Sequence, residues 1–243
     1  KGVTGYPFRL CLDNKCNDKS LKVGLKILPY VNDGDWVSYE CVLENIKTIQ
    51  GSYGFKRKES TKKCILVDKK RPENVEPHLL HLLSKLVIDK KTPHIILPIM
   101  NFVCDIDEIL KGNNTPPNID WKKREKNNDI FNIANVLVTE WADGGDLKNY
   151  ILSNYKEWSK NPYFEIIWSV LLFQIIFTLV IIFEKYPNFR HNDLKVDNIL
   201  VTITDFSPTS IKNYLYYIDG KYYSIPNVGF QIKFWDFDLS CIK

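Results

Sequence analysis

Two short segments of the chain carry residue types that phosphate chemistry requires. Residues 191–198, with the sequence HNDLKVDN, place Asp193 and Asn198 five residues apart just before an apolar stretch. Residues 235–238, with the sequence WDFD, form a second acidic segment. Transfer of a phosphoryl group needs a carboxylate that orients the attacking hydroxyl and accepts its proton, and it needs oxygen ligands that hold Mg²⁺ against the phosphates. A lysine beside the first carboxylate, such as Lys195, can neutralise charge on the transferred group.

These segments resemble two motifs of the protein kinases. HNDLKVDN is similar to the catalytic loop H-R-D-L-x-x-x-N, and DFD stands where that family has D-F-G. Further parts of the pattern precede them in the family's order. VGLK at residues 23–26 resembles the V-A-I-K strand, and GVTG at residues 2–5 resembles the end of the Gly-rich loop. Glu76 resembles the glutamate that pairs with the strand lysine, and TEWA at residues 139–142 resembles the gatekeeper and the adenine-binding hinge.

The resemblance implies a serine/threonine protein kinase that uses ATP and Mg²⁺ and acts on a protein substrate. It assigns catalytic roles to Asp193 and Lys195, and metal binding to Asn198 and Asp236. The residues that it assigns to ATP binding are Gly2, Gly5, Lys26, Glu76, Thr139, Glu140 and Ala142. The pattern HxDLKxDNIL, followed by an enlarged insert and DFDxS, resembles more closely the divergent serine/threonine kinases of large cytoplasmic DNA viruses, of the poxvirus virion kinase type.

The chain departs from the family pattern at several positions. Asn192 replaces the arginine that usually meets a phosphorylated activation loop, so control by such phosphorylation is not expected. Asp238 replaces glycine, and it is either a second metal ligand or a polar residue at a turn. Pro77 limits where the helix can start, because we expect proline only in the first turn of a helix. Pro77 also follows Glu76 directly, and Glu73 is a second candidate for the partner of the strand lysine. We expect His191 to be a packed structural residue, because Asp193 fits the role of the base.

Two other functions remain open. Small-molecule kinases of the choline or aminoglycoside type also use an H-N-D-L-x-x-x-N loop, and their later I-D-F-E motif is close to WDFD. Lys195 and the GGDL sequence after the hinge favour a protein kinase over that group. A pseudokinase scaffold would account for the degraded Gly-rich loop and for DFD. The presence of Lys26, Asp193, Asn198 and Asp236 together argues against it.

The order of the expected strands and helices around these residues indicates an α+β protein, and the resemblance implies a two-lobed, protein-kinase-like fold. We predict a β-rich N-terminal lobe at residues 1–140, with insertions near residues 31–70 and 105–130, and the start of a helical C-terminal lobe at residues 141–243. The expected strands are at residues 8–12, 22–28, 95–102, 136–141, 199–201 and 230–234, and the expected helices at residues 73–88, 146–152 and 166–183. Asp219-Gly220 predicts a type I′ turn in a hairpin of residues 214–218 and 221–225.

The apolar run Ile166 to Phe183 is long enough to cross a membrane, but a buried central helix is the favoured interpretation, because Gln174 lies in its middle and the run leads directly into the catalytic loop. We therefore expect no integral membrane segment. The net charge of +4 does not argue for nucleic acid as a partner. The six scattered cysteines favour reduced thiols, and we expect a cytoplasmic protein, in the host cytoplasm or the virion if viral.

The length suggests a segment of a longer protein. Met100 is the only methionine, residue 1 falls inside the expected Gly-rich loop, and residue 243 falls seven positions after Asp236. The resemblance implies that a helical remainder would follow, so the segment alone is not expected to be active.

Overall fold

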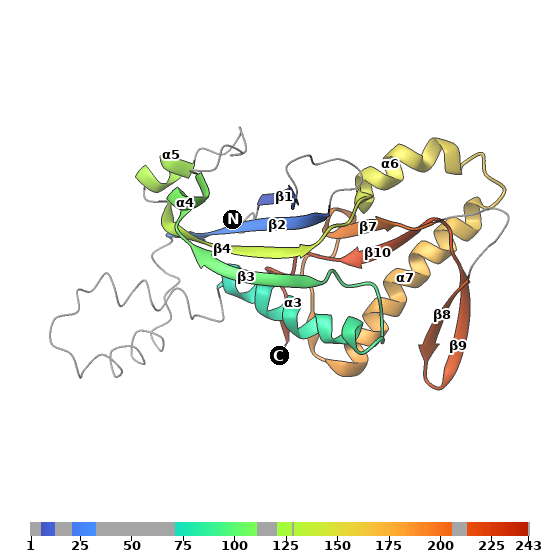
Figure 1. The fold of residues 1–243 in the computed structure, drawn as a ribbon. Helices are drawn as coiled ribbons and strands as arrows, with labels where there is room; N and C mark the ends of the chain where they lie inside the picture. The colour runs from blue at the N-terminus through green and yellow to red at the C-terminus, as the bar shows by residue number, and fades with distance from the viewer. Residues whose placement is uncertain are drawn as a thin grey trace.

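The computed structural model describes residues 6–12, 21–32, 71–110, 121–127, 129–205 and 213–242. Its N-terminal half is built on a four-stranded antiparallel sheet in the order β1-β2-β4-β3 (Figure 1). The strands are β1 (Tyr6–Cys11), β2 (Lys22–Val31), β3 (Pro98–Cys104) and β4 (Ile130–Glu140). The two central strands, β2 and β4, are mostly buried, as their apolar sequences predict. The fold is therefore α+β, with a strand-rich first part followed by helices, as in protein kinases.

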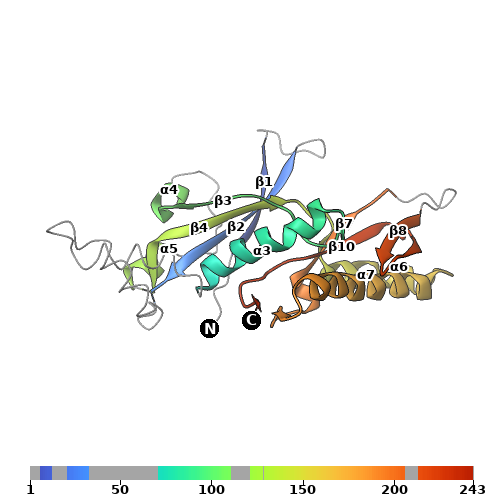
Figure 2. The ribbon, with the colours of Figure 1, turned by 90° about the horizontal axis from the view of Figure 1, so that it is seen from below.

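Helix α3 (Pro72–Ile88) crosses one face of this sheet (Figure 2) and buries Leu79, Leu80, Leu83 and Leu86 in the main core. The helix begins at Pro72, where a missing N–H costs nothing because the first amides of a helix have no helical partner. The expectation that Pro77 must lie in the first turn is wrong, since Pro77 lies inside the helix. The carbonyl of Glu73, which Pro77 cannot bond, accepts a hydrogen bond from Asn135 Nδ2 at 3.1 Å instead.

The region near residues 105–130, expected as a loop, contains two short helices among its described residues. These are α4 (Ile106–Leu110) and α5 (Trp121–Lys126). Ile106 is buried against Ile27, Ile130 and Ala134 on the sheet, which gives α4 an apolar contact that its short sequence did not reveal. The insertion expected near residues 31–70 lies outside the described residues, apart from Val31 and Asn32.

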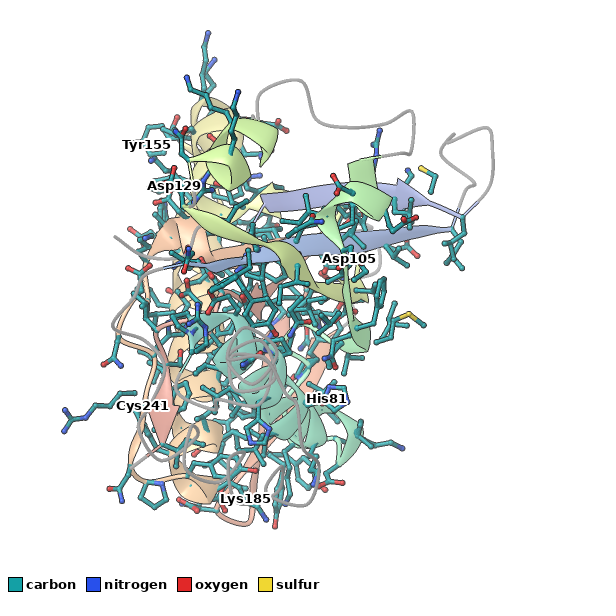
Figure 3. All side chains as sticks on the ribbon, turned by 90° about the vertical axis from the view of Figure 1, so that its left-hand side faces the viewer. His81, Asp105, Asp129, Tyr155, Lys185 and Cys241 are labelled. Atoms are coloured by element: carbon teal, nitrogen blue, oxygen red, sulfur yellow. The ribbon has the colours of Figure 1, made fainter. Side chains whose placement is uncertain are left out.

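The C-terminal half combines two helices with small sheets. The helices are α6 (Leu147–Trp158) and α7 (Phe164–Lys185), with the short 3-10 helix η1 (Val196–Asn198). The small sheets are β10-β7-β5, β11-β6 and β8-β9, formed by β5 (Gly145–Asp146), β6 (Phe189–Arg190), β7 (Ile199–Ile203), β8 (Asn213–Ile218), β9 (Lys221–Pro226), β10 (Phe230–Phe234) and β11 (Cys241–Ile242). In the view of Figure 3, Lys185 and Cys241 lie in the lower part of the molecule, and Asp105 and Asp129 lie beside the four-stranded sheet.

Two local predictions for this half are confirmed. Asp146 caps α6, because its side chain accepts a hydrogen bond from the Asn149 amide at 2.9 Å. Asp219 and Gly220 both have positive φ, at 46° and 78°, as a type I′ turn requires. The division into lobes at residues 1–140 and 141–243 stays a prediction, although β4 ends at its boundary.

Helix α7 is, among the described residues, the one helix long and apolar enough to cross a membrane by length and composition. It packs in the main core through residues that include Ile167, Leu171, Phe177 and Ile182. Gln174 is also buried, and its Oε1 accepts a hydrogen bond from the Ile232 amide of β10 at 2.9 Å. This bond gives the glutamine a structural role against a sheet, which accounts for a polar residue in the middle of the apolar run.

The cysteines follow the prediction of reduced thiols only in part. Cys104 and Cys241 are free. Cys11 is disulfide-bonded, so the expectation is wrong for this residue.

His94 hydrogen-bonds to residues of two strands, β8 and β10. It is completely buried, with Nδ1 2.9 Å from the carbonyl oxygen of Ile232 and Nε2 2.9 Å from the hydroxyl of Tyr216. Because a carbonyl can only accept, Nδ1 carries the proton and Nε2 accepts from the tyrosine. The neutral ring thus satisfies both nitrogens, and burial, the largest cause, lowers its pKa to about 3.

We predict that His94 makes the fold sensitive to acid. As the pH falls below 6.5, the unfolded chain binds a proton at His94 that the folded chain refuses until about pH 3, so stability decreases across that window. Between pH 7.5 and pH 5 this effect amounts to about 2 kcal/mol. Urea denaturation at the two pH values should show a smaller difference for His94→Gln than for wild type. An equal pH dependence in both proteins would contradict the assignment.

Candidate active site

A buried lysine lies at the centre of the candidate site. Lys26, in β2, is bonded by Nζ to Glu76 Oε1 at 2.8 Å, to Glu76 Oε2 at 2.6 Å and to Asp236 Oδ1 at 2.6 Å. The three acceptors match the three protons of an ammonium group. Glu76 comes from α3, and Asp236 follows β10, so three distant segments meet at one charge. Of the two candidates, Glu76 and not Glu73 is therefore the partner of the lysine.

Burial and the neighbouring charges have opposite effects on the pKa values of Lys26 and Glu76. The side chain of Glu76 is fully buried and that of Lys26 is 3% exposed, whereas that of Asp236 is 25% exposed. Burial acts to lower the pKa of Lys26, but the two carboxylates outweigh it and raise the pKa above its ordinary value. Burial raises the pKa of Glu76 to about 7, against the opposing effect of Lys26. The ammonium also lies 4.9 Å from the centre of the Trp235 ring, which favours the charged form.

The catalytic-loop residues form a second cluster. Asp193 Oδ2 accepts hydrogen bonds from Lys195 Nζ at 2.7 Å and from Asn198 Nδ2 at 2.8 Å. The same Asn198 amide donates to the backbone carbonyl of Asp193 at 2.9 Å, which fixes its orientation at the end of η1. The bond from Lys195, followed by the bond from Asn198, lowers the pKa of Asp193 despite some desolvation. Asp193 is therefore held as a carboxylate at neutral pH.

His191 connects the two clusters. It is buried, and its Nε2 lies 3.2 Å from the carbonyl oxygen of Trp235, the residue before Asp236. Its ring packs against Phe237 at 5.1 Å between centroids, and burial lowers its pKa. The structural role expected for His191 is consistent with these contacts. The hydrogen bond to Asp193 is the largest cause that raises the pKa of Lys195, and the charge of Asp236 in the other cluster adds to it.

The segment after β10 differs from D-F-G in a way the structure explains. Asp236 has a positive φ of 64°, whereas Asp238 does not, so position 238 does not require glycine. Asp238 is buried, and burial together with Asp236 raises its pKa to about 6. Whether it is a metal ligand stays open.

Local contacts also explain the asparagine at position 192. It has a positive φ of 62°, a conformation that asparagine tolerates better than most residues, and its Nδ2 donates to the carbonyl oxygen of Leu239 at 2.7 Å. The side chain thus joins the catalytic loop to the segment after Asp238.

The hinge candidates lie at the end of β4 and just beyond it. Thr139 is buried and directly opposes Gly24 of β2, where an added Cβ would lie 2.6 Å from Thr139 Oγ1. This close approach explains why glycine stands where the family has alanine. The Glu140 carboxylate accepts from the Leu97 amide at 2.9 Å and from Lys233 Nζ at 2.8 Å. Ala142 is buried just after the strand.

Sequence reasoning missed Lys233, which connects the hinge to the strand that leads to Asp236. A lysine inside the apolar strand FQIKF is the signal that could have revealed it. Gly2 and Gly5 lie outside the described residues, so the expected Gly-rich loop is not placed.

The donor set fits Mg²⁺. Asp236 and Asn198 offer hard oxygen ligands, and Asn198 uses its Nδ2 toward Asp193, which leaves its Oδ1 as the oxygen for a ligand. The described residues contain no group of three or more His, Cys, Asp or Glu side chains that could hold a metal ion by themselves. Few protein ligands are typical of Mg²⁺ sites that share the ion with substrate phosphates.

We predict that Lys26→Met lowers stability, because it leaves Glu76 buried without its partner. Breaking a buried pair in this way costs about 3–5 kcal/mol. Lys26→Met/Glu76→Leu should recover most of that difference in urea denaturation, since it removes both buried charges. Lys22→Met, in the same strand, is the control and should behave as wild type. Equal destabilisation in the single and double variants would contradict a buried ion pair.

Comparison with known proteins supports the same relationship. No family model matches the chain. Two proteins of Acanthamoeba polyphaga mimivirus, each named "Putative serine/threonine-protein kinase", are similar to it. The first is 40% identical over 185 residues, which is 71% of this chain and 38% of the relative, and the second is 46% identical over 72 residues, 30% of this chain and 18% of the relative. The chain thus spans well under half of either relative. By fold, by the order of its motifs and by these similarities, the chain is similar to divergent serine/threonine protein kinases of a large DNA virus.

Proposed function

We propose that the protein is a serine/threonine protein kinase that transfers the γ-phosphate of ATP to protein hydroxyls with Mg²⁺. The observation that carries this proposal is the meeting of Lys26, Glu76 and Asp236 beside the Asp193 cluster. Three segments far apart in the sequence contribute to it, and each supplies the residue type that phosphoryl transfer requires at that place. A scaffold would not need to retain this whole set.

Asp193 is proposed to receive the acceptor hydroxyl. Its Oδ2 already accepts two hydrogen bonds, from Lys195 and Asn198, so Oδ1 is the oxygen that can accept from the incoming hydroxyl. The orientation of the carboxylate is set before substrate arrives, which lowers the entropy cost of alignment. Lys195 can then donate to the transferred phosphoryl group, where negative charge develops.

Lys26 is proposed to bind the ATP phosphates. Its bond to Asp236 is the exchangeable one, because Asp236 is partly exposed whereas Glu76 is fully buried. Asp236 would then be free to hold Mg²⁺ together with Asn198. When bound, Mg²⁺ supplies positive charge that neutralises the phosphate oxygens.

The hinge is proposed to take the adenine. Thr139 and Glu140 end β4 and Ala142 follows it, and the Glu140 carboxylate accepts hydrogen bonds from Lys233 and the Leu97 amide. The Glu140 side chain is thus already bonded to protein groups. We therefore expect the backbone of this segment, and not the Glu140 side chain, to bind the adenine.

The proposed partner is a protein substrate, in the host cytoplasm or the virion. The bond from Lys195 to Asp193 supports serine or threonine as the acceptor, as in kinases that have lysine at this position.

We predict that Asp193→Asn reduces kcat by about 10²–10⁴-fold with little change in folding, because it removes the positioned base. The assay measures transfer of labelled phosphate from ATP with Mg²⁺ to a generic acceptor protein, and it uses the full-length protein because the chain covers 38% of its first relative. Asp197→Asn is the matched control. Asp197 lies in the same loop, but its side chain is 46% exposed and pairs only with the exposed Lys148 among the described residues.

Equal activity in Asp193→Asn and Asp197→Asn would contradict the role of Asp193. If the wild type phosphorylates no protein but consumes ATP with an amino alcohol, a small-molecule kinase is the correct function. If it binds no ATP, a scaffold is the correct function.

A further inference from the structure

A buried polar cluster joins the start of α3 to the end of β2. Arg71 and Glu73 are both buried and pair at 3.0 Å between Nη2 and Oε1. Arg71 Nη2 also donates to the carbonyl oxygen of Val31 at 2.6 Å, and the Val31 amide donates to Glu73 Oε1 at 2.8 Å. The pairing of β2 with β4 is irregular between Pro29 and Val31. The two side chains therefore bond the backbone of Val31 in the way that a neighbouring strand would.

Strand β4 contributes a further bond to the same turn of helix. Asn135 Nδ2 donates to the Glu73 carbonyl, which the proline at position 77 leaves without a helical partner. Tyr30 adds a bond from its hydroxyl to Asn74 Oδ1 at 2.6 Å. The first turn of α3 is thus tied to both central strands through Arg71, Glu73 and Asn135, which together we call the clasp.

The clasp is not optimised for stability. Arg71 Nε, Glu73 Oε2 and Asn135 Oδ1 are all buried and have no hydrogen-bond partner in the described part of the chain. Buried polar atoms without partners cost free energy, and apolar residues of similar volume are often equally or more stabilising than a buried ion pair. The cost is consistent with a role in fixing one orientation of the helix rather than in adding stability.

We propose that the clasp is a positioning device that holds Glu76 against Lys26. Glu73 lies three residues before Glu76, so the two side chains project from neighbouring turns on the same side of α3. Moving α3 away from the sheet would break the bonds to Val31 and Asn135 together and leave the Arg71–Glu73 pair with only its own mutual bond among these contacts. Contacts at the start of α3 therefore fix the position of Glu76 relative to Lys26. The inference rests on the proposed kinase function only for its effect on catalysis.

The test is the variant Arg71→Met/Glu73→Leu in the full-length protein, followed by amide hydrogen exchange and kinetics. The variant also frees the Val31 amide and carbonyl, so some loss of global stability is expected. Exchange in residues 74–80 should accelerate by about tenfold or more beyond what that loss accounts for. We expect kcat to fall by about 100-fold, as a displaced catalytic group would cause, with little change in KM for the protein substrate. Wild-type exchange and kcat, or losses that only follow a drop in global stability, would overturn the proposal.

Asn135→Ala provides a second test if the double variant does not fold. Its matched control is Asn132→Ala, in the same strand, which removes two exposed bonds with Asp107 of α4, one from Asn132 Nδ2 at 2.9 Å and one from the Asp107 amide to Asn132 Oδ1 at 3.2 Å. Only Asn135→Ala should accelerate exchange in α3 and lower kcat, and equal behaviour of the two variants would overturn the proposal. A wild-type protein without kinase activity would contradict the proposed function, while the exchange comparison would still decide whether the clasp orients the helix.

Discussion

The site depends on keeping one positive charge out of water. The ammonium of Lys26 is buried, and removing such a charge from water costs several kcal/mol unless every proton finds an acceptor. Its acceptors come from α3 and from the segment after β10, so the sheet, the helix and the C-terminal half must all be in place before the charge is satisfied. The need to provide acceptors for the buried Lys26 ammonium therefore also brings Glu76 and Asp236 together beside it.

Much of the fold could be predicted because its signals are local. The cap at Asp146, the Asp219-Gly220 turn and the apolar helix α7 each depend on residues close together in the sequence. The order of the motifs along the chain predicts the Lys26–Glu76 pair. What could not be predicted depends on distant partners: Pro77 is tolerated inside α3 because Asn135, on another strand, bonds the carbonyl that it frees. Helix α4 likewise depends on apolar contacts with the sheet rather than on its own short sequence.

Two of the four non-glycine residues with positive φ in the described part of the chain lie beside the candidate chemistry. Asn192 and Asp236 both have positive φ, and each such residue costs about 1–3 kcal/mol unless its surroundings compensate. Asn192 is compensated by its bond to the Leu239 carbonyl, and Asp236 by its bond to Lys26. Asn192 directly follows His191 and Asp236 directly follows Trp235, the two residues that a bond between Nε2 and the carbonyl oxygen joins. The catalytic loop and the acidic segment are therefore ordered as one unit.

The hairpin β8–β9 has a consequence for how this sequence can change in evolution. Tyr216 of the hairpin donates the hydrogen bond that satisfies Nε2 of His94, and its ring packs against both His94 and Phe177 in the core. A shorter insert that lacked Tyr216 would leave a buried imidazole nitrogen without a partner. Position 94 and the length of the insert are thus expected to covary, with histidine retained where the hairpin is present and replaced by an apolar residue where it is absent.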